Sequence, residues 1–335
     1  MLFSVVIPCF DSEATIERAV GSVLSQTHQD LEVVVVDDGS TDGTGDLVLR
    51  LAAADEAARG AGGGRVRLIR QENRGPGPAR NAGLREARGD AIAFLDADDH
   101  WMPRYLERVA WALEQFPYAG AVATDFLEVH GHRVRPAQRR GRREQARMVP
   151  DYFRARMDRT LASATSSVVI RRSVAEQVGP IREDLGLYGE EQEYWARITA
   201  RGVRWALLPE PLVLIDMTTY PSLTRGLSDF GQVRPPDEWS AHIWPLLGSE
   251  WEKSFTDYYL WRTKRYCVMC LRFGPGSAAK TAACRALRRA GGPLTRLELR
   301  AIILLPAGVA GLPFKVRSSL RALLLGDGVR RRTKR

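Results

Sequence analysis

Three carboxylates follow an apolar run in the segment A-F-L-D-A-D-D-H-W at residues 93–101. Asp96, Asp98 and Asp99 would repel one another if all three were buried without a positive partner. Carboxylates in the order D-x-D bind Mg²⁺ or Mn²⁺ through hard oxygen ligands, and such a cation keeps coordination positions open for phosphate oxygens. The segment therefore indicates a divalent cation with a diphosphate as its partner, and Asp99 is expected to cap a helix that starts near Pro103.

A second acidic pair ends the run V-V-V-V-D-D-G-S at residues 33–40. The carboxylates of Asp37 and Asp38 are suited to accept hydrogen bonds from the N–H groups of a base, and Gly39 permits a tight turn. Farther along the chain, N-R-G-P-G-P-A-R-N offers arginines, among them Arg80, to a base or a phosphate. Each of these patterns alone also fits a turn or a helix cap.

The elements around these acids are expected to bring them together. Over the first hundred residues, β-branched and apolar runs alternate with segments of helical spacing. The pattern predicts strands at 2–7, 31–36, 66–69 and 91–95, and helices at about 16–24, 44–58 and 78–87. Such alternation is typical of a parallel, doubly wound α/β sheet, in which ligands bind at the carboxyl ends of the strands. Because segments 8–11, 37–40 and 96–99 fall at such ends, they are expected to line one cleft.

The sequence lacks the motifs of several other classes of ligand-binding protein. The glycine-rich segment 57–64 precedes a strand and contains no G-K-S/T, which argues against a P-loop enzyme. No G-x-G-x-x-G follows the first strand, which argues against a dinucleotide oxidoreductase. The arginine-rich segment 133–147 carries no interleaved aromatic residues, so no nucleic-acid partner is expected. This segment is interpreted as a solvated loop, with contact to an anionic acceptor or a membrane surface as the alternative.

The chain has 335 residues, 49 Lys and Arg against 40 Asp and Glu, and a net charge of +9, which allows two domains. The start, M-L-F-S-V-V-I-P, has no charged region and no cleavage site, so it is interpreted as a strand, and a cytoplasmic location is expected. Cys267 and Cys270 have C-x-x-C spacing, but no second pair or histidine lies nearby. They are expected to be half-buried helix residues and not a metal or redox site.

Taken in order, six segments resemble family 2 glycosyltransferases with the GT-A fold. The resemblance covers about residues 3–215 and is most specific in the first hundred. The segments are S-V-V-I-P-C-F, S-V-L-S-Q-T, V-V-V-V-D-D-G-S-T-D-G-T, N-R-G-P-G-P-A-R-N-A-G-L, A-R-G-D-A-I-A-F-L-D-A-D-D and G-E-E-Q-E-Y-W-A-R.

The resemblance implies an enzyme that transfers a sugar from a nucleotide diphosphate donor, usually with inversion and usually with Mg²⁺ or Mn²⁺. It implies that Asp98 is the principal metal ligand and that Asp96 lies near the metal or the ribose. Glu191 matches the general base, although a Glu-Asp pair is usual where this chain has Glu190-Glu191. The remaining donor-binding positions implied by the resemblance are Pro8, Phe10, Asp11, Asp37, Asp38 and Arg80.

Glu190, Trp195 and Trp101 are expected to contact the acceptor or to support its site. For Trp101, packing in the core is the alternative. Acidic residues at the start of a helix also favour the helix dipole, so E-E-Q-E has a structural explanation as well. The resemblance favours a UDP-sugar as the donor. Two alternatives to a glycosyltransferase remain. One is a non-catalytic sugar-nucleotide binder, which Glu191 in place of Asp leaves open, and the other is a nucleotidyltransferase of similar fold.

The predicted organisation is a GT-A domain at 1–216 followed by a basic helical extension at 217–335. Within the first, 1–100 is expected to bind the nucleotide sugar, and 101–216 the acceptor, whose hydroxyl belongs to a glycan, a lipid-linked sugar or a small natural product. In the extension, A-I-I-L-L-P-A-G-V-A-G-L-P-F lies between basic residues. A surface anchor at the inner face of the membrane and a buried helical hairpin are both compatible with this pattern.

Overall fold

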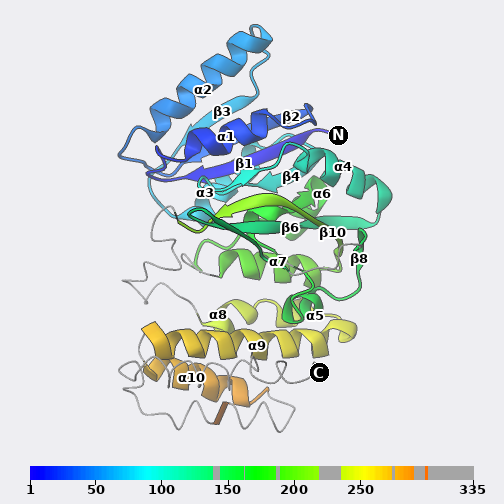
Figure 1. The fold of residues 1–335 in the computed structure, drawn as a ribbon. Coiled ribbons are helices and arrows are strands. Elements are labelled where there is room, and N and C mark those ends of the chain that lie inside the picture. Colours follow the sequence, from blue (N-terminus) through cyan, green and yellow to red (C-terminus); the bar gives the residue numbers. More distant parts are fainter. Residues whose placement is uncertain are drawn as a thin grey trace. The chain divides into compact units, whose positions relative to one another are not determined.

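The computed structural model describes residues 1–138, 144–161, 163–185, 189–218, 235–273, 276–289 and 299–300. The chain divides into two compact units, Met1–Gly226 and Leu227–Arg335, and each is described by itself. Figure 1 shows the ribbon coloured along the chain.

In the described part of the first unit, ten strands form one sheet with the order β3-β2-β1-β4-β9-β6-β10-β5, and β7 and β8 pair with β6 and β10. The strands are β1 (Phe3–Cys9), β2 (Leu31–Asp37), β3 (Val66–Arg70), β4 (Ala91–Phe94), β5 (His100–Trp101), β6 (Ala119–His130), β7 (Arg133–Pro136), β8 (Arg147–Val149), β9 (Val168–Arg171) and β10 (Arg204–Asp216).

The first four strands pair in parallel, β3 with β2, β2 with β1 and β1 with β4. Helices α1 (Ile16–Leu24) and α2 (Thr44–Arg59) bury Val20 and Val48 on the face that holds Val5 and Val33. Helix α3 (Pro76–Glu86) buries Ala79 and Ala82 against Val34 and Val36 on the opposite face. This half is therefore doubly wound, and the predicted strands and helices are confirmed to within two residues at most ends.

Helix α3 lies close to β1 because a glycine faces the strand. A Cβ atom built on Gly83 would come within 2.2 Å of Cγ1 of Val6, which is inside van der Waals contact. The sequence N-A-G-L therefore sets the distance between the helix that carries Arg80 and the central strand.

The second half of the sheet is mixed. Strand β9 pairs antiparallel with both β4 and β6, and β6 then pairs in parallel with β10. The sheet is therefore not parallel throughout, because β9 enters between β4 and β6 in the opposite direction. Helices α4 (Tyr105–Gln115), α5 (Tyr152–Met157), α6 (Arg172–Val178) and α7 (Glu190–Ala200) belong to this half.

The arginine-rich segment is more ordered than the loop that we expected. Arg133–Pro136 forms β7, an antiparallel partner of β6, and Arg147–Val149 forms β8, which pairs with β10. The prediction of a loop is therefore wrong at both ends of the segment, although residues 133–136 and Arg147 are exposed to solvent as expected. Residues 139–143 lie outside the described part of the chain.

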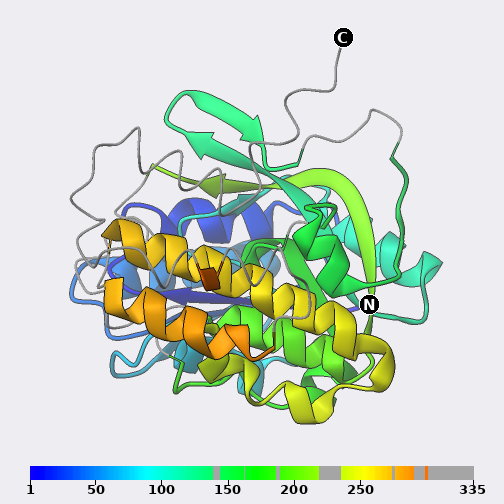
Figure 2. The same ribbon diagram turned by 90° about the horizontal axis from the view of Figure 1, so that it is seen from below.

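In the second unit, α8 (Pro236–Ser240) and a 3₁₀ turn at Trp244–Leu246 precede two longer helices, α9 (Ser249–Phe273) and α10 (Gly276–Leu287). Figure 2 shows α9 and α10, in yellow and orange, side by side. Trp239 packs edge-on against Phe255, with ring centroids 6.3 Å apart. No helix in the described ranges is both long and apolar enough to span a bilayer. The predicted anchor at 301–314 lies outside those ranges.

Cys267 and Cys270 lie on a helix, α9, as predicted, but they are fully buried and not half-buried. Burial raises the pKa of both thiols, to about 12 for Cys270. Buried thiols of this kind are unreactive, which agrees with a structural role.

Candidate functional site

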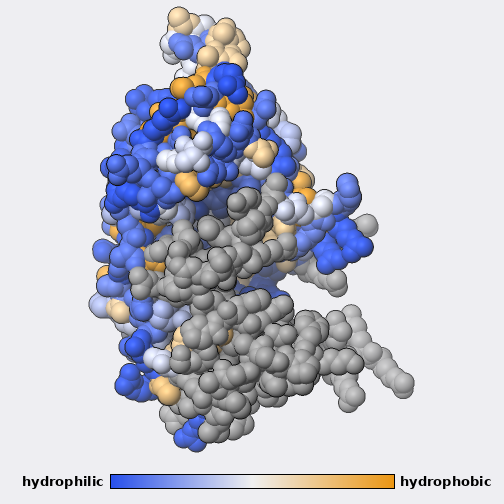
Figure 3. Space-filling model, turned by 90° about the vertical axis from the view of Figure 1, so that its left-hand side faces the viewer, coloured by the Kyte–Doolittle hydropathy of each residue, from blue (hydrophilic) through white to orange (hydrophobic). Residues whose placement is uncertain are grey.

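The carboxyl ends of β1, β2 and β4 lie along one edge of the sheet because the three strands are adjacent and parallel. The polar segments that follow these strands are therefore neighbours, as the sequence predicted. Figure 3 views the side of the molecule toward which β1 runs in Figure 1, and its described surface is mainly hydrophilic.

The end of β1 is tied to the turn after β2. The Thr41 amide donates to Oδ1 of Asp11 (2.7 Å), and the Asp11 amide donates to Oγ of Ser40 (3.0 Å). Asp11 has a positive φ of 45°, a conformation that aspartate tolerates better than most residues. Phe10 lies between Pro8, which is buried, and Asp11, which is exposed. Phe10 is 47% exposed, so its ring is free to stack on a planar ligand.

Asp37 and Asp38 are both buried at the end of β2. Oδ1 of Asp37 accepts a hydrogen bond from the Ser40 amide (2.9 Å), which closes the turn. The carboxylate of Asp38 accepts from the amides of Arg74 (3.0 Å) and Gly75 (2.7 Å). Asp38 therefore holds the loop before α3 in place, and contact with a base would use its remaining lone pairs.

Asp96, Asp98 and Asp99 form the turn after β4. Asp99 is buried, and its carboxylate accepts from Oγ of Ser166 (2.6 Å) and from the Asp216 amide (3.1 Å). The prediction that Asp99 caps a helix is wrong, because α4 begins at Tyr105 without a side-chain cap. Asp99 instead joins the acidic turn to Ser166, just before β9, and to the end of β10.

Burial and the neighbouring Asp96 raise the pKa of Asp98 to about 6, and Asp216 adds to the effect. Burial and the charges of Asp96 and Asp98 also raise the pKa of Asp99. Arg18 lies near this turn, where its guanidinium donates to the Asp98 carbonyl oxygen (2.8 Å) and pairs with Asp216 (3.1 Å). The negative charge of Asp98 is thus only partly compensated, which suits a residue that binds a cation.

Arg80 on α3 bridges two carboxylates. Nη2 lies 2.8 Å from Oδ1 of Asp96, and Nη1 lies 3.1 Å from Oε1 of Glu190, the first residue of α7. Arg80 is 6% exposed, and both carboxylates raise its pKa, so it stays ionised. We expected Arg80 to contact the donor, but its guanidinium is turned toward protein carboxylates instead.

Glu190 and Glu191 begin α7, but their environments differ. Glu190 is 4% exposed, and burial raises its pKa to about 7 although Arg80 opposes the shift. The Glu191 carboxylate is half-buried, and its Oε2 accepts a hydrogen bond from Oγ1 of Thr165. Of the two, Glu191 is the carboxylate that an approaching hydroxyl can reach.

Both candidate tryptophans are buried. The Trp101 ring stacks on Tyr105 with centroids 4.3 Å apart, and its Nε1 donates to the Ser166 carbonyl oxygen (2.8 Å). Trp195 is 2% exposed and packs edge-on against Phe94, with centroids 6.2 Å apart. Neither side chain therefore offers a surface to an acceptor, and packing is the role that the structure supports for both.

The sequence reasoning missed Arg18, Thr165, Ser166 and Asp216. Arg18 and Asp216 form an ion pair although 198 positions separate them in the sequence. Thr165–Ser167 forms a 3₁₀ turn directly before β9. Hydroxyl residues in A-T-S-S have no spacing that points to a site, so only the folded chain identifies them.

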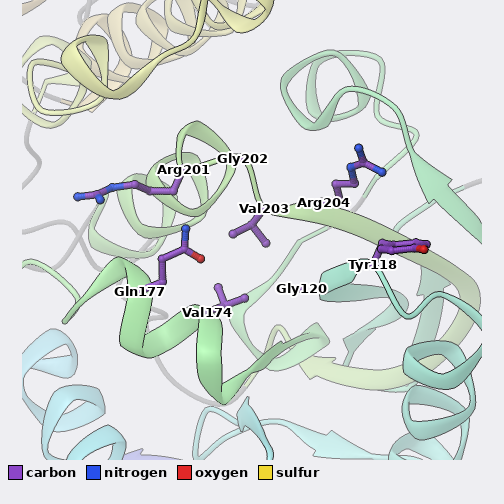
Figure 4. A pocket seen from close by; sticks show the side chains of 8 residues that line it. All are labelled: Tyr118, Gly120, Val174, Gln177, Arg201, Gly202, Val203 and Arg204. Atoms are coloured by element: carbon purple, nitrogen blue, oxygen red, sulfur yellow. The ribbon is translucent and has the colours of Figure 1, made fainter.

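A separate hollow of about 400 Å³ opens near the amino ends of β6 and β10, at the opposite edge of the sheet from the candidate site. Figure 4 shows the eight lining residues, which are Tyr118, Gly120, Val174, Gln177, Arg201, Gly202, Val203 and Arg204. The candidate site is therefore set by the strand ends and not by this hollow.

Comparison with known proteins identifies the family. The model of glycosyl transferase family 2 matches residues 4–179, about half of the chain. The chain therefore belongs to glycosyl transferase family 2, as its motifs predicted.

Several curated relatives share this region. An uncharacterized glycosyltransferase of Nostoc sp. is 33% identical over 184 residues, which are 54% of this chain and 54% of that protein. The succinoglycan biosynthesis protein ExoO of Rhizobium meliloti is 46% identical over 126 residues, 37% of this chain and 32% of ExoO. The putative teichuronic acid biosynthesis glycosyltransferase TuaG of Bacillus subtilis is 40% identical over 108 residues, 32% of this chain and 40% of TuaG. The matched region spans about half or less of each relative.

The fold is shared with a solved structure. The crystal structure of S. aureus TarS 1-349 in complex with UDP-GlcNAc superposes with a TM-score of 0.70 over 97% of this chain and 92% of that chain, at 18% identity. The fold is thus the GT-A fold, followed by a helical region that comprises α8 to α10.

Proposed function

We propose that this protein is an inverting glycosyltransferase that transfers a sugar from a nucleotide diphosphate donor to a hydroxyl of a glycan. The observation that carries the proposal is that the Asp96–Asp99 turn and the start of α7 lie close together. Arg80 joins Asp96 to Glu190, and the adjacent Thr165 and Ser166 join the Glu191 carboxylate to the acidic turn. A donor-binding turn and an accessible base are thereby linked in one framework.

The donor half would hold the nucleotide between the ends of β1 and β2. The exposed Phe10 ring and the Asp37-Asp38 turn are suited to a planar base with N–H groups. We propose uridine as that base, since TarS, which shares this fold, was crystallised in complex with UDP-GlcNAc. Pro8 and Asp11 would shape the wall of this pocket through the backbone.

Asp98, with Asp96 beside it, would hold Mg²⁺ or Mn²⁺. Within the described ranges no three His, Cys, Asp or Glu side chains converge as a metal cage. A single aspartate together with diphosphate oxygens would fit the octahedral coordination that these cations prefer, and the raised pKa of Asp98 marks the charge that a cation would balance. When bound, the cation would neutralise charge on the departing diphosphate.

Glu191 would remove the proton from the attacking hydroxyl as its oxygen approaches the anomeric carbon opposite the diphosphate. One displacement of this kind inverts the centre. Glu190 cannot take this role because it is buried against Arg80. Glu is one methylene longer than Asp, so the acceptor hydroxyl would sit slightly farther from the helix backbone than with an aspartate base.

The acceptor is proposed to be part of a polysaccharide, because two relatives carry names from succinoglycan and teichuronic acid biosynthesis. The strongly basic segment 315–335 is proposed to bring the enzyme to an anionic membrane surface where such acceptors are assembled.

The test is calorimetric binding of UDP, GDP and dTDP, each with and without Mn²⁺, to the full chain and to Asp98→Ala. Metal-dependent binding of UDP that Asp98→Ala abolishes is expected. The matched control is Asp46→Ala, which removes an exposed carboxylate from α2 and should bind as the wild type does. Absence of binding by all three nucleotides would refute the proposal.

Turnover separates an enzyme from a binder. Glu191→Gln should keep UDP affinity and lose sugar transfer. A wild type that binds UDP-sugars but neither transfers nor hydrolyses them would instead be a non-catalytic binder, and release of pyrophosphate from a nucleoside triphosphate would indicate a nucleotidyltransferase.

A further inference from the structure

The 3₁₀ turn Thr165–Ser167 carries two adjacent hydroxyls that contact different parts of the candidate site. Thr165 is 3% exposed, and Ser166 is fully buried. The turn leads directly into β9, which is held by β4 on one side and β6 on the other. Its position is therefore fixed by the centre of the sheet.

The Ser166 side chain contacts the acidic turn at two points. Its Oγ donates to Oδ2 of Asp99 (2.6 Å) and accepts from the Asp96 amide (3.1 Å). Its carbonyl oxygen also accepts from Nε1 of Trp101 (2.8 Å). Ser166 thus fixes both ends of the Asp96–Asp99 turn.

The Thr165 side chain points to the other half of the site. Its Oγ1 donates to Oε2 of Glu191, the candidate base at the start of α7. A carboxylate held through one oxygen has its rotamer restricted, and its second oxygen remains available for a substrate proton. Thr165 therefore controls where the basic oxygen lies.

We propose that Thr165 is a positioning residue for Glu191 and that the turn it shares with Ser166 sets the separation between the base and the donor-binding acids. The inference rests on the proposed function. Thr165 touches neither substrate nor cation, and it acts only by holding the Glu191 carboxylate. Ser166 likewise holds the Asp96–Asp99 turn in position.

This arrangement assigns separable effects to neighbouring residues. Loss of the Thr165 hydroxyl frees the base and should lower kcat, because misplacing a reacting group by about 1 Å can cost on the order of 100-fold in rate. Loss of the Ser166 hydroxyl removes a partner from two groups of the acidic turn and should weaken donor binding. A turn with a merely structural role would not separate the two quantities.

The experiment uses the full chain and the variants Thr165→Val, Thr165→Ser, Ser166→Ala and Ser163→Ala. Valine keeps the branched shape of threonine without the hydroxyl, and serine keeps the hydroxyl. Ser163 is the matched control, since its buried hydroxyl has no hydrogen-bond partner in the described part of the chain. UDP release from UDP-glucose, UDP-galactose and UDP-N-acetylglucosamine, with water as acceptor, gives kcat, and calorimetry with UDP and Mn²⁺ gives the donor Kd.

We expect Thr165→Val to lose about 10- to 100-fold in kcat with donor Kd within about twofold of the wild type. Thr165→Ser should recover most of the rate, Ser166→Ala should raise Kd, and Ser163→Ala should match the wild type. Full kcat in Thr165→Val, or equal losses in Thr165→Val and Thr165→Ser, would overturn the inference while Glu191→Gln still tests the proposed function by itself.

If the wild type binds UDP but releases none from UDP-sugars, crystal structures of the wild type and Thr165→Val decide the question. A Glu191 carboxylate that moves in the variant supports the inference, and one that keeps its place overturns it. A wild type that binds no nucleotide contradicts the proposed function, and the crystal structures still test whether Thr165 positions Glu191.

Discussion

At the scale of single residues, the site is organised by buried charge. Arg80 pairs with both Asp96 and Glu190, whereas Asp98 keeps a charge that nearby protein groups balance poorly. The two residues therefore have different roles: Arg80 holds Asp96 and Glu190 in place, and Asp98 remains available for a cation. Two predictions test it.

Binding of UDP with Mn²⁺ should depend on pH through Asp98. Its pKa is raised to about 6 in the free protein, so the carboxylate is ionised above that pH and protonated below it. Because a metal ligand must be deprotonated, apparent affinity should fall about tenfold per pH unit below 6. Calorimetry between pH 5 and 8 measures this, and Asp98→Asn should bind weakly at every pH. Affinity that is flat from pH 5 to 8 in the wild type would contradict the assignment.

Removing the bridge should destabilise the first unit. Arg80→Met leaves two carboxylates without their buried partner, and the expected loss in the free energy of unfolding is about 3 kcal/mol. Arg74→Ala is the control, since Arg74 is exposed in its pair with Glu183 and should cost less than about 1 kcal/mol. Urea denaturation compares them, and equal losses would show that the bridge contributes nothing special.

At the scale of elements, the distance between α3 and β1 affects the geometry of the site, because α3 carries Arg80. Gly83 allows the close approach, since a Cβ there would meet Val6 at 2.2 Å. The helix and its arginine are therefore placed by the absence of a side chain.

Gly83→Ala should destabilise the protein by about 1–3 kcal/mol through overpacking. Gly21→Ala in α1 is the matched change, because nothing lies within 4 Å of the added Cβ, and it should stabilise by about 0.5–1 kcal/mol through higher helix propensity. Chemical denaturation of both variants measures the contrast. Similar effects of the two changes would mean that the contact is relieved by a cheap shift of α3.

The elements of the donor half could be predicted because their periodicity is local, as in the β-branched run of β2 and the helical spacing of α1. The acidic turn and Glu191 could be found from their motifs. By contrast, the pairing of β9 between β4 and β6, the contact of Thr165 with Glu191 and the inward turn of Arg80 depend on residues far apart in sequence. No local pattern encodes such contacts, so Arg80 was expected at the donor and Asp99 at a helix cap.

At the scale of the whole molecule, charge is unevenly distributed along the chain. Acids converge at the strand ends of the first unit, whereas residues 315–335 carry Lys315, Arg317, Arg321, Arg330, Arg331, Arg332, Lys334 and Arg335 against Asp327 alone. The proposed donor site and the proposed membrane contact therefore use opposite ends of the chain and opposite charges.

The full chain should sediment with vesicles that contain phosphatidylglycerol and should be released by salt, since each basic residue near an anionic surface contributes about 1 kcal/mol. The triple change Arg330→Gln, Arg331→Gln and Arg332→Gln should weaken binding by about 100-fold. The control, Arg50→Gln with Arg85→Gln and Arg201→Gln, removes the same charge from exposed positions in the first unit. Equal binding to neutral phosphatidylcholine vesicles would refute the proposed contact.

The place of β9 in the sheet has a consequence for the nascent chain. Strand β4 pairs with β1 on one side, but its other edge finds no partner until β9 has left the ribosome. An unpaired central edge is a template for wrong pairing, so the β4 edge stays at risk of wrong pairing for as long as β9 has not been synthesised. The same step that covers this edge brings Ser166 to the acidic turn, whereas Glu191 on α7, the partner of Thr165, follows later in the chain.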